Sequence, residues 1–453
     1  MGQILVLLVP LLLLYLRDPP IGAMTTELGA VVMMWSLGAA LLIVVLHHLA
    51  GRILLDLSRV RDPGLQRSAS RLRRLQSLAI VALVSLYYVQ IQVWYLPEAL
   101  TAVVLPAHTP FIGDFLLLLP FVLPFLAVRV EVVRTLARLR GIRPSSREVF
   151  GGTLRLLGVV MVPQLLYLNA YRVLFLSGGP LAEWAGDHPA FAMGSGAFLF
   201  FLVFAVSPAM VRYLYPRTDM AEIPGLEPLD RELRELGRSA GLRIARIIVW
   251  RTGAQNIANA AVAGLLRRYQ RFFITDHLLR RLTLPEIRAV MAHEIGHSKL
   301  RHPAFNYLLA LSAGVFLIWS LLALVPLLEE TGLGDSVTGS VLIIGLDGVY
   351  IFTIFSFFLR RFEHQADMVA VALSGSPEPF VDALERLGRL NLVPDKKRSL
   401  THPALRTRID WLRARLLEAP AEEWVRRFRR SNILMVSVIL GLYALTLLLV
   451  ELG

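Results

Sequence analysis

Long apolar runs, repeated along most of the chain, constrain its fold more than any other feature. A bilayer core about 30 Å thick takes roughly 20 helical residues to cross. Runs of about that length cover residues 28–49, 77–96, 111–128, 156–176, 191–213, 305–327, 337–359 and 433–449. Hydrophobic residues make up 55% of the 453 residues, well above their share in an average soluble domain. The sequence therefore predicts a mainly α-helical, polytopic integral membrane protein.

A shorter apolar run, residues 4–16, precedes these and brings the predicted number of spans to about nine. The three residues before it include no Lys or Arg, which a signal peptide would carry at its basic start. We expect an N-terminal anchor, with a cleaved signal peptide as the alternative.

Basic residues are concentrated in the short loops beside the apolar runs. The net charge is +13, and arginines cluster at 52–74 and 129–147, whereas the connections at 178–189 and 329–335 are acidic. Positively charged loops stay in the cytoplasm, so this alternation places the Arg-rich loops inside and the acidic ones outside. The same distribution explains the net charge without a nucleic-acid partner, and we expect none.

Residues 216–304 form the first long stretch without a predicted span. Residues 229–240 have the pattern of an amphipathic helix, and 247–250, 258–263 and 269–274 that of short strands. A further helix begins at a capping box formed by Thr283 and Glu286. The predicted domains are an N-terminal membrane region (1–215), a small α+β domain on the cytoplasmic side (216–304), two membrane helices (305–359), a helical cytoplasmic region (360–430) and a last membrane helix (431–453).

The helix after the capping box contains an H-E-x-x-H motif at residues 293–297. On a helix His293 and His297 lie on one face, one turn apart, so both can bind a single zinc ion. Glu294 is then placed to act as general base towards a metal-bound water. The alternative is a pair of histidines that only pack. The chain has no cysteine, so a zinc site would need histidines and carboxylates.

A catalytic zinc takes three protein ligands and keeps one position open. A third histidine in the form H-E-x-x-H-x-x-G-x-x-H is excluded, because Leu300 and Pro303 occupy the required positions. A Glu from a second helix remains, and Glu363 is the best candidate. Asp367, one turn further along, is placed to accept a hydrogen bond from a ligating histidine. The alternative is that both carboxylates are solvated partners of the arginines at 360 and 361.

Three motifs in order resemble the membrane gluzincins that include the type I CAAX prenyl proteases and the heat-shock protease HtpX. They are H-E-I-G-H (293–297), R-R-F-E-H-Q-A-D (360–367) and T-H-P-A-L-R-T-R-I (401–409), and the resemblance covers roughly residues 216–412. It implies one Zn²⁺ ion with Glu363 as third ligand, and it implies that His402 and Arg408 contact the substrate and polarise the scissile carbonyl. Asn259 matches the asparagine of the family's edge strand, which holds the substrate backbone.

These observations predict a zinc metalloendopeptidase of a bacterial cytoplasmic membrane, with its active site on the cytoplasmic side. Its partners would be a peptide or membrane-protein substrate and the lipid bilayer; the sequence does not determine an oligomeric state. The alternatives are a prenyl-peptide (CAAX) protease proper, a non-catalytic scaffold or chaperone with the same fold, and a transporter. A transporter would need charged residues within its spans, where Asp114 and Asp347 are the evident candidates.

Overall fold

The structure of the chain is a computed structural model. It describes residues 24–61, 64–103, 112–175, 178–188, 191–192, 194–199, 201–203, 217–253, 256–266, 270–332, 337–395, 399 and 402–452. The described residues are mostly helical and include one four-stranded sheet. The chain divides into two compact units, the first made mainly of residues 1–170 and the second of most of the remainder.

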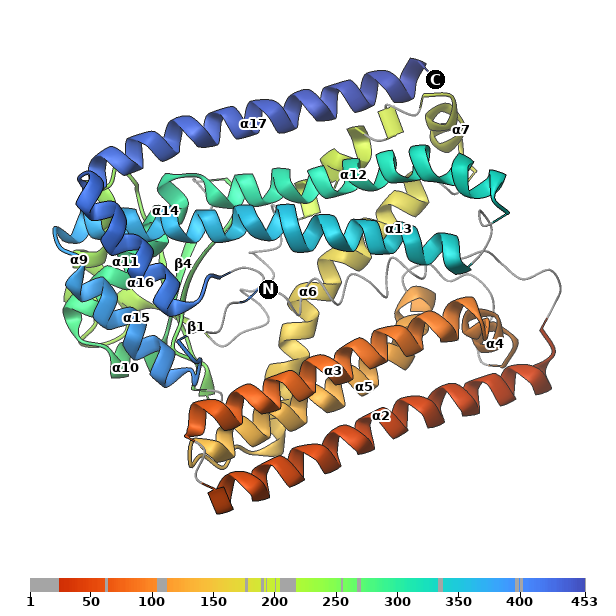
Figure 1. Cartoon of the computed structure of the whole chain (residues 1–453), viewed down its shortest axis with the longest axis horizontal. Coiled ribbons are helices and arrows are strands. Elements are labelled where there is room, and N and C mark those ends of the chain that lie inside the picture. The colour runs from red at the N-terminus through yellow and green to blue at the C-terminus, as the bar shows by residue number, and fades with distance from the viewer. Residues whose placement is uncertain are drawn as a thin grey trace. The chain divides into compact units, whose positions relative to one another are not determined.

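The first unit is a bundle of long helices. Its elements are α2 (Thr26–Arg61), α3 (Leu65–Gln92), α4 (Leu96–Val103), α5 (Ile112–Leu139) and most of α6 (Ser146–Phe175). Helices α2, α3 and α5 contact one another, and α4 packs against α2 (Figure 1). The buried ring of Tyr87 lies 5.6 Å from that of Phe121, and its hydroxyl donates to the carbonyl of Leu117. The apolar faces of these helices therefore have a packed core of their own.

Five helical stretches among the described residues are long and apolar enough to cross a membrane. They are Thr26–Leu54, Leu65–Gln92, Phe115–Leu139, Ser146–Phe175 and Ala421–Leu448, and each overlaps one predicted span. The chain is thus an integral membrane protein. The spans predicted at 305–327 and 337–359 fall within helices of the second unit, whereas 4–16 and much of 191–213 lie outside the described residues. The total of about nine stays a prediction.

The second unit contains a small mixed sheet. Its strands are β1 (Arg217–Asp219), β2 (Ile247–Trp250), β3 (Ala260–Ala263) and β4 (Arg271–Thr275), in the order β1-β2-β4-β3. The two inner strands run parallel and both outer strands run antiparallel to their neighbours. Strands β2, β3 and β4 lie where the apolar pattern predicted them. Strand β1 was not predicted, because three polar residues carry no apolar alternation.

Helices cover the sheet and enclose the main core of this unit. They are α9 (Glu227–Ser239), α10 (Asp276–Arg281), α11 (Leu284–Lys299), α15 (Glu378–Leu390) and α16 (Leu405–Glu418); α7 (Pro180–Asp187) and the 3₁₀ turn Met220–Glu222 also belong to the unit. The predicted capping box starts α11, since Glu286 accepts from the backbone and hydroxyl of Thr283. Helix α11 contacts α9, β3, α14 and α15 and is buried along most of its length.

Three long helical segments run side by side away from the sheet-bearing part of this unit (Figure 1). They are α12 (His302–Glu330), α17 (Ala421–Leu452), and α13 (Val337–Tyr350) with α14 (Ser356–Ser374). A π-helical turn at Ile351–Phe355 joins α13 directly to α14. Single π turns inside helices are frequent near functional sites. This continuous segment carries the second motif from the apolar region to α11.

Candidate active site

Helices α11 and α14 form the centre of the predicted site, and they approach closely at Gly296. A Cβ atom at Gly296 would lie 3.0 Å from Cα of Ala366 and 3.0 Å from Cβ of Val369. Only a residue without a side chain allows this approach. Ala366 follows Glu363 by one turn of α14, so the contact brings the Glu363 carboxylate next to both histidines of α11.

The three predicted ligands converge on one point. The Nε2 atoms of His293 and His297 lie 3.2 Å apart. The carboxylate of Glu363 places one oxygen 3.8 Å from Nε2 of His293 and the other 3.5 Å from Nε2 of His297. Four ligands about 2.0–2.1 Å from a tetrahedral zinc would be about 3.3 Å apart. The donor atoms and their spacing therefore fit a zinc ion, and these three residues form a candidate metal cluster among the described residues.

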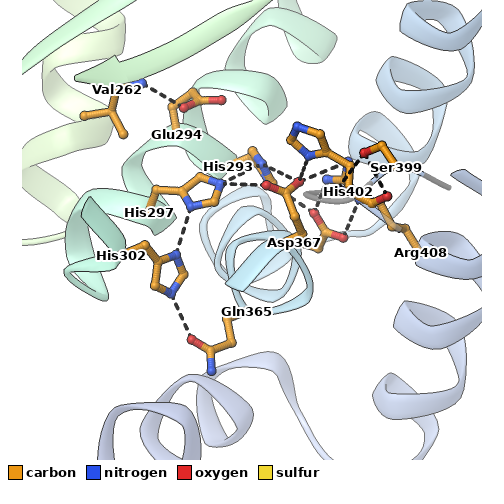
Figure 2. Close-up of polar contacts among 11 residues, drawn as sticks. Val262, His293, Glu294, His297, His302, Gln365, Asp367, Ser399, His402 and Arg408 are labelled. Atoms are coloured by element: carbon orange, nitrogen blue, oxygen red, sulfur yellow. Dashed lines mark hydrogen bonds and ion pairs between the residues drawn. The ribbon is translucent and has the colours of Figure 1, made fainter. Parts of the chain in front are cut away.

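His293 is oriented by a carboxylate on its other side. Its Nδ1 lies 3.0 Å from Oδ1 of Asp367, the position predicted for that residue. Asp367 in turn accepts two hydrogen bonds from the Arg408 guanidinium, one from Nε to Oδ2 at 2.9 Å and one from Nη2 to Oδ1 (Figure 2). The ring of Phe380, from α15, stacks on the His293 ring at 5.6 Å. These contacts hold the imidazole with Nε2 towards the ligand cluster.

A different chain of hydrogen bonds orients His297. Its Nδ1 lies 2.9 Å from Nδ1 of His302, whose Nε2 lies 2.8 Å from Oε1 of Gln365 (Figure 2). Gln365 and Asn432 of α17 exchange two amide hydrogen bonds, which make Oε1 of Gln365 an acceptor. Nε2 of His302 therefore carries a proton and its Nδ1 accepts from His297. Nε2 of His297 is left with the lone pair that a metal needs.

Sequence reasoning missed this second chain. The sequence predicted no role for His302, which is fully buried. In the sequence, only two weak signals point to this chain of hydrogen bonds: His302 follows His297 by five residues, and Gln365 follows Glu363 by two. His364, the other histidine of the second motif, lies against the ring of Trp411.

Glu294 lies beside the ligand cluster and against the edge strand. Its carboxylate accepts from the backbone N–H of Val262 in β3 at 3.0 Å (Figure 2). Burial raises the pKa of Glu294 above its ordinary value, with nearby charges of both signs adding smaller effects. A carboxyl with a raised pKa is suited to take up and return a proton near neutral pH.

The structure brings His402 and Arg408 to the same centre. Nδ1 of His402 lies 2.9 Å from Oε2 of Glu363, and Nη1 of Arg408 lies 3.4 Å from the same oxygen. The His402 side chain is 58% exposed, whereas Arg408 is buried. Asn259 lies further off, immediately before β3, with its side chain exposed and its backbone paired to Thr275.

The buried charges set the protonation state of the carboxylates. Burial alone would raise the pKa of Glu363, but His402 and Arg408 outweigh it and hold that pKa well below its ordinary value. Burial likewise acts upwards on Asp367, and the guanidinium of Arg408 outweighs it and lowers the pKa to about 2. Both carboxylates are therefore ionised at neutral pH, the form in which a carboxylate binds metal or polarises a histidine.

The histidines differ from one another. Burial lowers the pKa of His297 well below its ordinary value and that of His302 to about 4. Burial also acts downwards on His293, but the hydrogen bond and charge of Asp367 outweigh it and leave the pKa raised. A neighbouring carboxylate of this kind makes an imidazole a stronger metal ligand.

A small sheet with an edge strand lies beside a helix whose two histidines converge with a carboxylate from a second, long helix, and this is the arrangement of a membrane metalloprotease. The chain belongs to peptidase family M48, whose model matches residues 227–416. It is 30% identical over 237 residues to a protease HtpX homologue of Aeropyrum pernix, covering 48% of this chain and 72% of that protein. A protease HtpX homologue of Syntrophobacter fumaroxidans is 28% identical over 256 residues, covering 53% and 86%.

The crystal structure of S. mikatae Ste24p has the same fold. It aligns with a TM-score of 0.56 at 18% sequence identity and covers 87% of this chain and 100% of that chain. The likeness to the prenyl-protease and HtpX families inferred from the three motifs is thereby confirmed, and it extends in fold to most of the membrane region.

Proposed function

We propose that the chain is a zinc-dependent metalloendopeptidase in which His293, His297 and Glu363 bind one Zn²⁺ ion. The observation that carries this proposal is the convergence of two Nε2 atoms and one carboxylate at separations suited to tetrahedral zinc. A non-catalytic scaffold of the same fold is not favoured, because His293, Glu294, His297 and Glu363 are all present in the sequence and the chain belongs to a peptidase family.

Zinc, when bound, supplies a Lewis acid and lowers the pKa of a coordinated water towards about 7. Glu294 takes the proton from the attacking water and later returns it to the leaving amine. Its hydrogen bond to Val262 in β3 keeps the carboxylate between the metal ligands and the strand edge. A peptide paired with that edge would present its carbonyl beside Glu294.

His402 and Arg408 stabilise the negative charge that develops on the scissile carbonyl oxygen. Both carry hydrogen-bond donors at the centre, and the His402 side chain is exposed there to solvent. Arg408 also holds Asp367, and through it His293. Asn259 contacts the substrate backbone at the start of the edge strand.

The substrates are membrane proteins or lipid-anchored peptides cleaved from the cytoplasmic side of a bacterial inner membrane. The Arg-rich loops support this orientation, because the positive-inside rule predicts that α11 and the second motif, in the first half of α14, lie on the cytoplasmic side. The long apolar helices of the same unit hold the site close to the bilayer.

The test measures zinc content and casein cleavage with detergent-purified wild type, Glu294→Ala, Glu363→Ala and, as a matched control, Glu385→Ala. Glu385 lies on the exposed side of α15 and pairs with Arg389. We expect Glu294→Ala to keep zinc and lose cleavage, Glu363→Ala to lose both, and the control to retain both. A wild type without zinc, or an active Glu294→Ala enzyme, would refute the assignment.

A further inference from the structure

The edge strand β3 offers only part of its length to a pairing peptide. In its register with β4, Ala261 faces Phe273, and the preceding Asn259 pairs through its backbone with Thr275. Alternate residues of an antiparallel strand turn their backbone groups to opposite sides. Ala258, Ala260 and Val262 therefore direct their N–H and C=O groups away from β4. The bond from Val262 to Glu294 agrees with this.

The outward groups of Ala258 are already occupied by the side chain of Asn391. The N–H of Ala258 donates to Oδ1 of Asn391 at 3.1 Å, and Nδ2 of Asn391 donates to the carbonyl of Ala258 at 2.7 Å. One carboxamide thus makes both hydrogen bonds that a residue of an antiparallel partner strand would make. No further strand residue can pair there while Asn391 is in place.

Asn391 belongs to the helix that borders the zinc ligands. It caps the C-terminus of α15, and Phe380 near the start of that helix stacks on His293. The eleven residue steps from Phe380 to Asn391 span about 16 Å at the helical rise. The four residue steps from Val262 to Ala258 span about 13 Å along the strand. Helix α15 and the edge of β3 therefore cover similar distances, from the metal ligands at one end to the contact between Asn391 and Ala258 at the other.

We propose that Asn391 is a specificity-determining residue that ends the substrate-binding edge and limits how many substrate residues are held beyond the cleaved bond. The inference rests on the proposed protease function. Both groups of Ala260 point outwards, the arrangement that one residue of an antiparallel peptide fills. Such a peptide runs opposite to β3, so its C-terminal part extends from Val262, beside Glu294, towards Ala258.

The register gives the length of this track. The substrate residue opposite Val262, taken as the last residue before the cleaved bond, lies next to the catalytic carboxylate. The second residue after the bond then pairs with Ala260. The fourth residue after the bond would need Ala258, which Asn391 occupies. Residues at and beyond this fourth position find no backbone partner and leave the edge.

The test uses a casein peptide that the wild-type enzyme cleaves, resynthesised with one to six residues after the cleaved bond, and a matched series extended on the other side. For wild type, KM falls with C-terminal length and stops falling before the fourth added residue. For Asn391→Ala, the fourth and fifth residues lower KM by about a further tenfold, since two backbone hydrogen bonds become available. Extension on the N-terminal side has the same effect in both enzymes.

The control is Arg389→Ala, which removes an exposed polar side chain at the same end of α15 and is expected to keep the wild-type length profile. Equal profiles for Asn391→Ala and wild type would overturn the proposal, and a gain confined to N-terminal extension would overturn the direction of the peptide. If Asn391→Ala melts below wild type, Asn391→Ser, whose side chain is too short to reach both groups of Ala258, replaces it. Failure of the zinc-loaded wild type to cleave even the shortest peptides refutes the protease function itself.

Discussion

Adding one methyl group at Gly296 tests how the second motif is positioned. Gly296→Ala places a Cβ 3.0 Å from Ala366 Cα and Val369 Cβ and 3.1 Å from the Ala366 carbonyl oxygen. Ordinary carbon contacts lie near 3.5–4.0 Å. Because part of this contact is backbone, α14 must move away from α11 by about half an ångström.

The two consequences differ in size. Overpacking costs about 1–3 kcal/mol, and replacing a helical glycine by alanine returns roughly 1 kcal/mol of helix propensity, so the net loss of stability is small. Metal–ligand distances tolerate only about 0.2 Å, and the displaced helix carries Glu363. We therefore expect a loss of zinc affinity of about 10- to 100-fold, the range seen when the support of a metal site is disturbed.

The assay is competition for zinc with a chromogenic chelator, together with thermal unfolding of the zinc-free proteins. Gly441→Ala is the matched control, because that glycine of α17 has no atom near its added Cβ and should keep wild-type affinity. Wild-type zinc affinity in Gly296→Ala would show that the close approach of α11 and α14 does not position Glu363.

Four further predictions concern the same unit. His302→Ala lowers zinc affinity by about 10- to 100-fold in the chelator assay, since His297 loses the partner that orients it. Arg408→Lys keeps the charge but loses the fork on Asp367, so kcat/KM for casein falls more than tenfold with zinc still bound; an unchanged rate would contradict this. Chelation of the metal lowers the melting temperature, and zinc at about 1,000 times its Kd restores about 4 kcal/mol. Burial raises the pKa of Asp276, but hydrogen bonds from Thr252 outweigh it and leave the pKa lowered, so its stabilisation is complete above pH about 4 and is lost as the pH falls through the lowered value. At pH 7, Asp276→Asn therefore has a free energy of unfolding about 1 kcal/mol below that of wild type and a lower melting temperature. This difference in stability from wild type becomes smaller below pH 4.

The sequence predicted the site best where the functional residues and the signals for the helix that carries them lie in the same short segment. The capping box at Thr283 starts α11 as predicted, and the spacing of His293 and His297 puts both Nε2 atoms on one side. Glu363 could be selected because a carboxylate at the end of a membrane helix needs a cation, which the metal site provides. The short polar strand β1 has no such signal, and it was missed.

The sequence by itself determined that the chain is a membrane protein, that it carries an H-E-x-x-H helix and which residues are the candidate metal ligands. These properties depend on hydrophobic periodicity and on residue types at fixed spacings, both of which act within one helix. Only the tertiary structure decided what surrounds the ligands: the contact of Gly296 with α14, the bonds from His302 through Gln365 to Asn432, and the pairing of Asn391 with Ala258. Each depends on groups far apart in the chain meeting within a few ångströms, and a buried polar group is satisfied by whichever partner the packing brings to it.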